Sequence, residues 1–185
     1  LSIYNNYGVL TEMKKEYDSA LFFYKKGLVL KQRINDQVGI PYSLNNIAGV
    51  FVLRKQFDKA EENYQKALKI RQKINDTVGI AENYSYLGDV YFTKNDFKKA
   101  IGFCQKTTEI TDEHKYLGLS QDTYRKISEC YEALGDYQNA LLNFKKFSSI
   151  KDSLINHETN AKIAELEVKF DTNEKEKQLL QKQAE

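Results

Sequence analysis

The stretch Tyr84–Cys104, which reads YSYLGDVYFTKNDFKKAIGFC, decides the fold of this chain. Apolar and small residues in each half of it lie three and four positions apart, which places them on one face of a helix. These residues are Leu87, Gly88 and Tyr91, followed by Phe97, Ala100 and Cys104. Between the two halves the polar pair Asn95-Asp96 interrupts the pattern, and Asp96 is suited to cap the second helix. The stretch therefore predicts two antiparallel helices joined by a tight turn.

The same pattern recurs four times at intervals of 40 residues. Each copy has an alanine in its second half, at Ala20, Ala60, Ala100 and Ala140. An aromatic residue precedes each alanine by three positions, at Tyr17, Phe57, Phe97 and Tyr137. A small residue precedes each alanine by twelve positions, at Gly8, Ala48, Gly88 and Ser128. Such a repeat predicts helical hairpins that stack, because one hairpin alone cannot bury both of its apolar faces.

We therefore expect an all-α fold: a right-handed α-solenoid of four helix-turn-helix repeats over residues 1–155, followed by a long helix over residues 156–185. The repeats are expected at about residues 1–37, 38–77, 78–117 and 118–155. In each repeat the small residue and the alanine let the two helices approach closely, and the aromatic residues fill the remaining space. A single proline and nine glycines in 185 residues are consistent with a helical fold.

The connections between hairpins carry a second repeated motif. Residues 33–40 read RINDQVGI and residues 73–80 read KINDTVGI, whereas residues 111–119 lack the motif. The Asn-Asp pairs at 35–36 and 75–76 are interpreted as turn formers rather than as calcium ligands, because Asn and Asp side chains favour turns.

The chain resembles the tetratricopeptide repeat family, whose pattern is Trp-x2-Leu-Gly-x2-Tyr, then Ala-x3-Phe, then Pro. Leu87, Gly88 and Tyr91 match its first part, with Tyr84 in place of Trp, and the resemblance covers about residues 1–155. The period is 40 residues where the family has 34, and the family proline is missing after every second helix. The extra residues fall in the connections between hairpins, so we expect longer helices on both sides of these turns.

The resemblance implies a concave groove lined by the first helices, and a partner is expected to bind there. The candidate residues are Asn5, Asn6, Tyr42, Asn45, Asn46, Tyr86, Asp89, Phe92, Arg125, Lys126 and Glu129. Asparagine both donates and accepts hydrogen bonds, which suits an extended peptide backbone. The alternative is that these are solvated residues without a partner. Co-chaperone repeats hold a C-terminal carboxylate with Lys and Asn where this chain has Asn5 and Val9, so heat-shock C-terminal tails are not the expected ligand.

Residues 156–185 form a different segment, which lacks Gly and Pro and is rich in good helix formers. Ile163, Leu166 and Phe170 have helical spacing, but the apolar seam is interrupted at Asn173 and Lys177. Two interpretations remain open. Either the first half of the segment caps the open end of the solenoid, or the helix pairs with its copy in a homodimer and carries a signal onward.

A second resemblance lies in the segments KDSL (151–154), AELEVKFDT (164–172) and EKEKQLL (174–180). They resemble the end of the repeat region in bacterial membrane-bound sensor histidine kinases and related regulators of two-component signal transduction. The resemblance implies a sensor domain on the periplasmic side of the inner membrane, which binds a peptide, protein or small molecule and signals through the C-terminal helix to an output domain. The alternative is a cytoplasmic scaffold that binds a signalling protein directly.

The residue types needed for catalysis or metal binding do not cluster. The two histidines, His114 and His157, have no partner motif, and no phosphate-binding glycine loop or zinc spacing occurs, so we expect no enzyme activity, metal or cofactor. Cys104 and Cys130 are interpreted as small buried residues, with a disulfide between neighbouring helices as the alternative. A net charge of +2 gives no reason to expect nucleic acid binding. No apolar run approaches a membrane span, so a membrane is expected only through a flanking segment.

Overall fold

The computed structural model describes residues 2–154 of the chain. Every regular element in this range is a helix: α1 (Ser2–Met13), α2 (Tyr17–Arg33), α3 (Gly39–Leu53), α4 (Phe57–Lys73), α5 (Thr77–Thr93), α6 (Phe97–His114) and α7 (Leu117–Ala133). A further helix follows over residues 137–154. The expected all-α fold is thus confirmed, whereas the helix expected at residues 156–185 lies outside the described residues.

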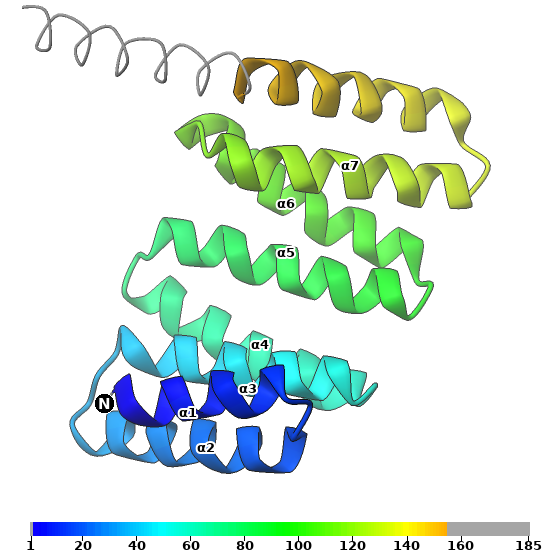
Figure 1. The fold of residues 1–185 in the computed structure, drawn as a ribbon. Coiled ribbons are helices and arrows are strands. Elements are labelled where there is room, and N and C mark those ends of the chain that lie inside the picture. Colours follow the sequence, from blue (N-terminus) through cyan, green and yellow to red (C-terminus); the bar gives the residue numbers. More distant parts are fainter. Residues whose placement is uncertain (1, 155–185) are drawn as a thin grey trace, which may run out of the picture.

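The helices stack in chain order into a solenoid (Figure 1). From α1 to α7 each helix packs against the next one along the chain, and α5 also contacts α7. The first helices of the hairpins are α1, α3, α5 and α7, and we call the surface that they form the first-helix face. α2, α4, α5 and α7 each have 17 residues and α6 has 18, whereas α3, which follows the turn at residues 33–40, has 15; the expectation of long helices on both sides of the turns thus holds at residues 73–80 but not on the far side of the first turn.

The ends of the helices follow a shorter period, which the sequence does not reveal. Residues with positive φ recur every 20 positions: Lys15, Asn35, Lys55, Asn75, Asn95, Lys115 and Gly135. After each of them the backbone N–H reaches back to a carbonyl five residues earlier, as from Asp96 to Tyr91 over 2.9 Å. This left-handed cap satisfies carbonyl groups that the helix end would otherwise leave unpaired.

The helices approach closely where the sequence has small residues. Ala20, Ala60 and Ala100 are fully buried in three successive apolar clusters. A Cβ added at Gly8 would lie 2.3 Å from the Tyr24 ring, and one at Gly88 would lie 2.8 Å from the Cys104 sulfur. The expectation that small residues allow the helices of a hairpin to meet is therefore confirmed.

The Asn-Asp-x-Val-Gly motif builds the turn before the next first helix. Asn75 takes the left-handed conformation that ends α4. Asp76 then caps α5 by accepting a 2.9 Å hydrogen bond from the Gly79 N–H. A Cβ at Gly79 would lie 2.1 Å from Asp76 Oδ2 and 2.6 Å from Arg71 Cδ, so the glycine makes room for the capping carboxylate. Asp36 and Gly39 repeat this arrangement over 2.8 Å, which confirms that both pairs form turns.

Gly79→Ala is expected to lower the free energy of unfolding by about 2 kcal/mol, because the new methyl group overpacks the cap. Urea denaturation followed by circular dichroism measures the loss. Gly118→Ala is the matched control, since Gly118 also lies in the first turn of a first helix but a Cβ there meets nothing within 4 Å. The explanation fails if both variants have the same stability as the wild type.

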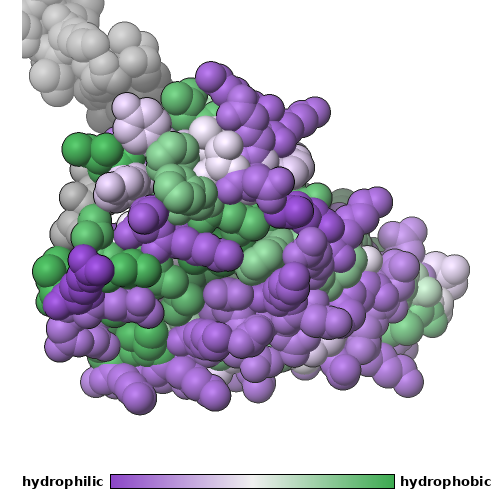
Figure 2. All heavy atoms as spheres, turned by 90° about the horizontal axis from the view of Figure 1, so that it is seen from below, coloured by the Kyte–Doolittle hydropathy of each residue, from purple (hydrophilic) through white to green (hydrophobic). Residues whose placement is uncertain are grey.

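Viewed from the α1–α2 end of the solenoid, hydrophilic side chains cover most of the surface, with apolar groups between them (Figure 2). At this end Ile3, Tyr7 and Leu10 are exposed and line a hollow of about 330 Å³. The corresponding positions of α3 include Ile47 and Val50, which are buried against α2. The difference follows from position in the stack, because α1 has no preceding second helix among the described residues.

Candidate binding surface on the first helices

The first helices are linked to one another by polar side chains that the sequence singles out. Asn46 of α3 donates a 2.6 Å hydrogen bond from Nδ2 to Asn5 Oδ1 of α1. Both residues are only partly buried, and the neighbouring Asn6 is exposed. The structure therefore brings these three asparagines together at the α1 end of the first-helix face.

Asn45 lies deeper than the sequence analysis assumed. It is buried, and it exchanges hydrogen bonds with Asn83 of α5, of which Asn83 Nδ2 to Asn45 Oδ1 is the shorter at 2.9 Å. Asn83 also donates to the Tyr64 carbonyl over 3.1 Å. Asn45 thus joins α3 to α5 and, through Asn83, to α4 rather than offering its amide to a ligand, because its side chain faces the following hairpin.

The charged residues among the binding candidates connect α5 to α7. Lys126 of α7 forms an ion pair with Asp89 of α5. Arg125 lies between two carboxylates of its own helix, at 3.6 Å from Asp122 and 3.2 Å from Glu129. These candidates do lie together, as the repeat register predicts, and each of the two cations has a carboxylate partner.

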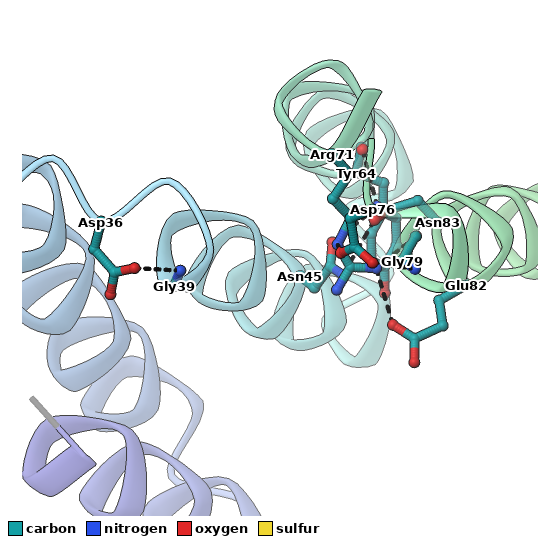
Figure 3. A network of polar contacts seen from close by, with 9 residues as sticks. All are labelled: Asp36, Gly39, Asn45, Tyr64, Arg71, Asp76, Gly79, Glu82 and Asn83. Carbon is teal, nitrogen blue, oxygen red and sulfur yellow. Dashed lines mark hydrogen bonds and ion pairs between the residues drawn. The ribbon is translucent and has the colours of Figure 1, made fainter. Parts of the chain in front are cut away.

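A buried arginine that the sequence analysis missed lies beside the first-helix face. Arg71 of α4 has a fully buried side chain, and its Nη1 donates to the Gly79 carbonyl over 2.5 Å and to Glu82 Oε2 over 2.9 Å (Figure 3). Its Nε lies 3.5 Å from Asp76 Oδ2. Nε and Nη2 are both buried and have no hydrogen-bond partner among the described residues. Such an unpaired buried donor is costly in a folded protein and marks a place where an acceptor can bind.

Two candidate tyrosines lie close to this arginine. The Tyr42 ring covers the guanidinium, with 4.9 Å between its centroid and Arg71 Cζ, and the residue is 50% exposed. Tyr86 is 37% exposed and stacks on Tyr64 at 5.2 Å. Partial burial and then the nearby Glu82 carboxylate raise the pKa of Tyr86, so its hydroxyl stays protonated and can donate. The two rings and the arginine form a mixed aromatic and polar patch.

Phe92 lies apart from this patch. It is partly buried and packs edge to face on Phe97 at 5.7 Å, where α5 turns into α6. It therefore helps to close a hairpin, and the structure does not bring it together with Tyr42 or Tyr86.

A weak sequence signal for Arg71 exists in the repeat. Lys31 occupies the same position one repeat earlier, also four residues before an Asn-Asp pair, and its Nζ donates to Ser43 Oγ over 2.9 Å. In the next repeat the position is Thr111, which is buried. The sequence thus shows only that a basic residue recurs at this position, and the burial of Arg71 is visible in the structure alone.

Among residues 2–154, the remaining residues with reactive side chains do not form a site, and His157 lies outside this range. Cys104 and Cys130 are free and buried, and burial raises the pKa of their thiols to about 12 and about 11, so both stay protonated. His114 is exposed and stacks on Tyr116. Within residues 2–154 no group of His, Cys, Asp and Glu is arranged to hold a metal ion. No helix in this range is long and apolar enough to cross a membrane.

Residues 40–113 match the family model of the tetratricopeptide repeat. No curated protein matches the sequence. The structure is similar to BtubC (BKLC) from P. vanneervenii, with 24% identity, a TM-score of 0.74, and coverage of 83% of this chain and 63% of that one. It is also similar to the apo form of RapI, with 21% identity, a TM-score of 0.76, and coverage of 86% and 58%.

A Rap protein in complex with Competence and Sporulation Factor is a third similar structure, with 17% identity, a TM-score of 0.70, and coverage of 77% of this chain and 40% of that one. The chain thus spans less than two thirds of the length of each of these proteins. At such identities the similarity establishes the fold alone. The match over residues 40–113 supports a tetratricopeptide repeat in this part of the chain, and the similar structures show that the chain folds as an α-solenoid of this kind.

Proposed function

We propose that this chain is a protein-binding module that holds an extended peptide segment on its first-helix face. The observation that carries the proposal is the patch of Tyr42, Tyr86 and Arg71, where a buried guanidinium nitrogen lacks an acceptor beneath a half-exposed aromatic ring. Tyrosine and arginine are among the residue types that dominate binding energy at protein interfaces.

The polar side chains beside this patch suit a peptide main chain. Asn6 is exposed and Asn46 is partly exposed, and each amide can donate to a carbonyl and accept from an N–H. The Asn46–Asn5 bond holds one of these amides in place before any ligand arrives, and such preorganisation lowers the entropy cost of binding.

We further propose that the ligand is sensed outside the inner membrane, as part of a receptor of the sensor histidine kinase type. This step is supported by the resemblance of residues 151–180 to the end of the repeat region in such receptors. One similar structure, the Rap protein, is solved in complex with Competence and Sporulation Factor. The signal would pass through residues 156–185 if ligand binding favours one of two arrangements of the solenoid.

Tyr42→Ala is expected to weaken binding of a peptide to the chain by about tenfold, because the variant removes a half-exposed aromatic side chain from the first-helix face. The probe is a 12-residue peptide enriched against this chain from a random display library, and fluorescence anisotropy measures its affinity. Tyr137→Ala is the control, since Tyr137 is also exposed but belongs to the helix of residues 137–154. Equal affinity of both variants and the wild type would remove Tyr42 from the binding surface.

The compartment is tested on the native full-length protein. Protease added to cells with a permeabilised outer membrane is expected to cut the repeat region while the inner membrane stays intact. A region that resists protease until the inner membrane is lysed would contradict the receptor and favour the cytoplasmic scaffold.

A further inference from the structure

Charge is distributed unevenly between the two sets of helices. The first helices contain six carboxylates and two cations: Glu12, Glu82, Asp89, Asp122, Glu129 and Glu132 against Arg125 and Lys126. The second helices have the opposite balance, with 15 Lys and Arg against 8 Asp and Glu over α2, α4, α6 and residues 137–154. The near-neutral total therefore conceals an acidic set of first helices and a basic set of second helices.

Within the first helices the charge is also uneven. α3 has no charged residue and α1 has only Glu12, which accepts a hydrogen bond from the Tyr24 hydroxyl over 2.8 Å. The other five carboxylates and both cations belong to α5 and α7. The first-helix face thus has a nearly uncharged half, formed by α1 and α3 with Glu12 as its single carboxylate, and an acidic half, formed by α5 and α7.

The cations of the acidic half are already neutralised. Lys126 pairs with Asp89, and Arg125 lies within 3.6 Å of two carboxylates. Arg71, which reaches this face from α4, pairs with Glu82 at 2.9 Å. With Arg71 included, five carboxylates meet three cations, so the acidic half retains a net negative charge and attracts cations.

A second observation at the same place points to a ligand. Arg71 Nη2 is a buried donor without an acceptor, on a guanidinium that pairs with Glu82 through Nη1 and lies under the Tyr42 ring. The half-exposed Tyr42 ring lies over the guanidinium, 4.9 Å from Cζ, at the surface of the first-helix face. Because Glu82 already neutralises the guanidinium, the free donor suits a neutral acceptor such as a peptide carbonyl better than a second carboxylate.

From these contacts we infer that the ligand is an extended peptide with an uncharged part at one end and basic residues at the other. Its uncharged part lies over α1 and α3, a main-chain carbonyl accepts from Arg71 Nη2, and its Lys or Arg residues lie over α5 and α7. The inference rests on the proposed function and specifies the chemistry of the partner, because the carboxylates of α5 and α7 would repel an acidic peptide.

The test uses the whole 185-residue chain as bait for a random display library of 12-residue peptides at about 50 mM salt, where charges are weakly screened. Recovered peptides are expected to have at least about a threefold higher ratio of Lys and Arg to Asp and Glu than the unselected library, with the basic residues near one end. Enriched peptides with no excess of basic residues would overturn this inference and leave the proposed function intact. Failure to enrich any peptide would overturn the proposed function itself.

Variants of the chain locate the contact. Asp122→Asn with Glu129→Gln is expected to weaken binding of a recovered basic peptide by about tenfold, because two partly exposed carboxylates of α7 are lost. The control is Glu109→Gln with Glu113→Gln, which makes the same change of charge at two exposed residues of α6. Equal losses in both double variants would show that only the total charge matters, and the inference would be wrong. Replacing the basic residues of the peptide by Gln should reproduce the loss with the wild-type chain.

Discussion

Leu87→Ala is expected to lower the free energy of unfolding by about 3 kcal/mol, which is the usual cost of such a change in a packed core. Leu87 is 1% exposed and belongs to the apolar cluster in which Ala48 and Ala60 bring α3 and α4 together. A shorter side chain there leaves a cavity at the centre of the solenoid, because the helices around it are held by their own contacts on both sides. Urea denaturation followed by circular dichroism measures the loss, together with the slope of the transition.

Leu53→Ala is the matched control for this experiment. Leu53 ends α3 and is 49% exposed, so its truncation removes little buried area and is expected to cost less than about 1 kcal/mol. Similar losses in the two variants would mean that Leu87 does not lie in a closely packed core. Because a solenoid can unfold repeat by repeat, a broader transition in Leu87→Ala would show that its effect is local to the α3–α6 region.

Arg71→Ala is expected to cost about 2–3 kcal/mol, because it leaves charged and polar partners of a buried group without their cation. Gly79 loses a donor for its carbonyl, Glu82 loses its ion pair, and Tyr42 loses the guanidinium beneath its ring. Both carboxylate partners of Arg71 are partly exposed and can be rehydrated, which keeps the expected loss below that of a fully buried pair. Thermal and urea denaturation measure the effect.

Lys31→Ala tests whether burial is the reason for this effect. Lys31 has the same position one repeat earlier, but it is only partly buried and donates to the hydroxyl of Ser43. The loss of this contact is expected to lower the free energy of unfolding by less than about 1 kcal/mol, as for other exposed polar contacts.

Arg71→Lys is a second test, since an ammonium cannot reproduce the forked contacts of the guanidinium. A variant Arg71→Lys with wild-type stability would contradict the role assigned to those contacts.

The helices could be predicted from the sequence because the decisive signal is local and repeated. Leu87, Gly88 and Ala100 recur in kind every 40 residues, and each such set defines a helix face without reference to distant parts of the chain. Asp96 illustrates the same point for a cap, since its carboxylate accepts from the Lys99 N–H over 3.2 Å as its position before the helix suggests. The left-handed residues were harder to foresee, because Lys15 and Lys55 are not residue types that favour that conformation.

The candidate site could be predicted only in part. Asn5, Asn46, Asp89 and Lys126 do form contacts between neighbouring first helices. By contrast, Asn45 is buried and Arg71 reaches the face from a second helix, and neither fact is visible in the repeat register. The register gives the direction of a side chain around its own helix, whereas burial also depends on the length of the side chains opposite.

What the sequence determined by itself is the number and order of the hairpins and the residues that bring their helices together, because the spacing of apolar and small residues along a helix is a local property. Only the tertiary structure decided which polar side chains remain available for a partner. Asn83 of α5 satisfies the side chain of Asn45, which lies 38 residues earlier in the chain. Arg71 of α4 lies under the Tyr42 ring of α3 and keeps Nη2 without a hydrogen-bond partner. Neither outcome is set within a single helix. The availability of a polar group depends on every neighbour that desolvates it or bonds to it, and those neighbours meet only when the hairpins stack.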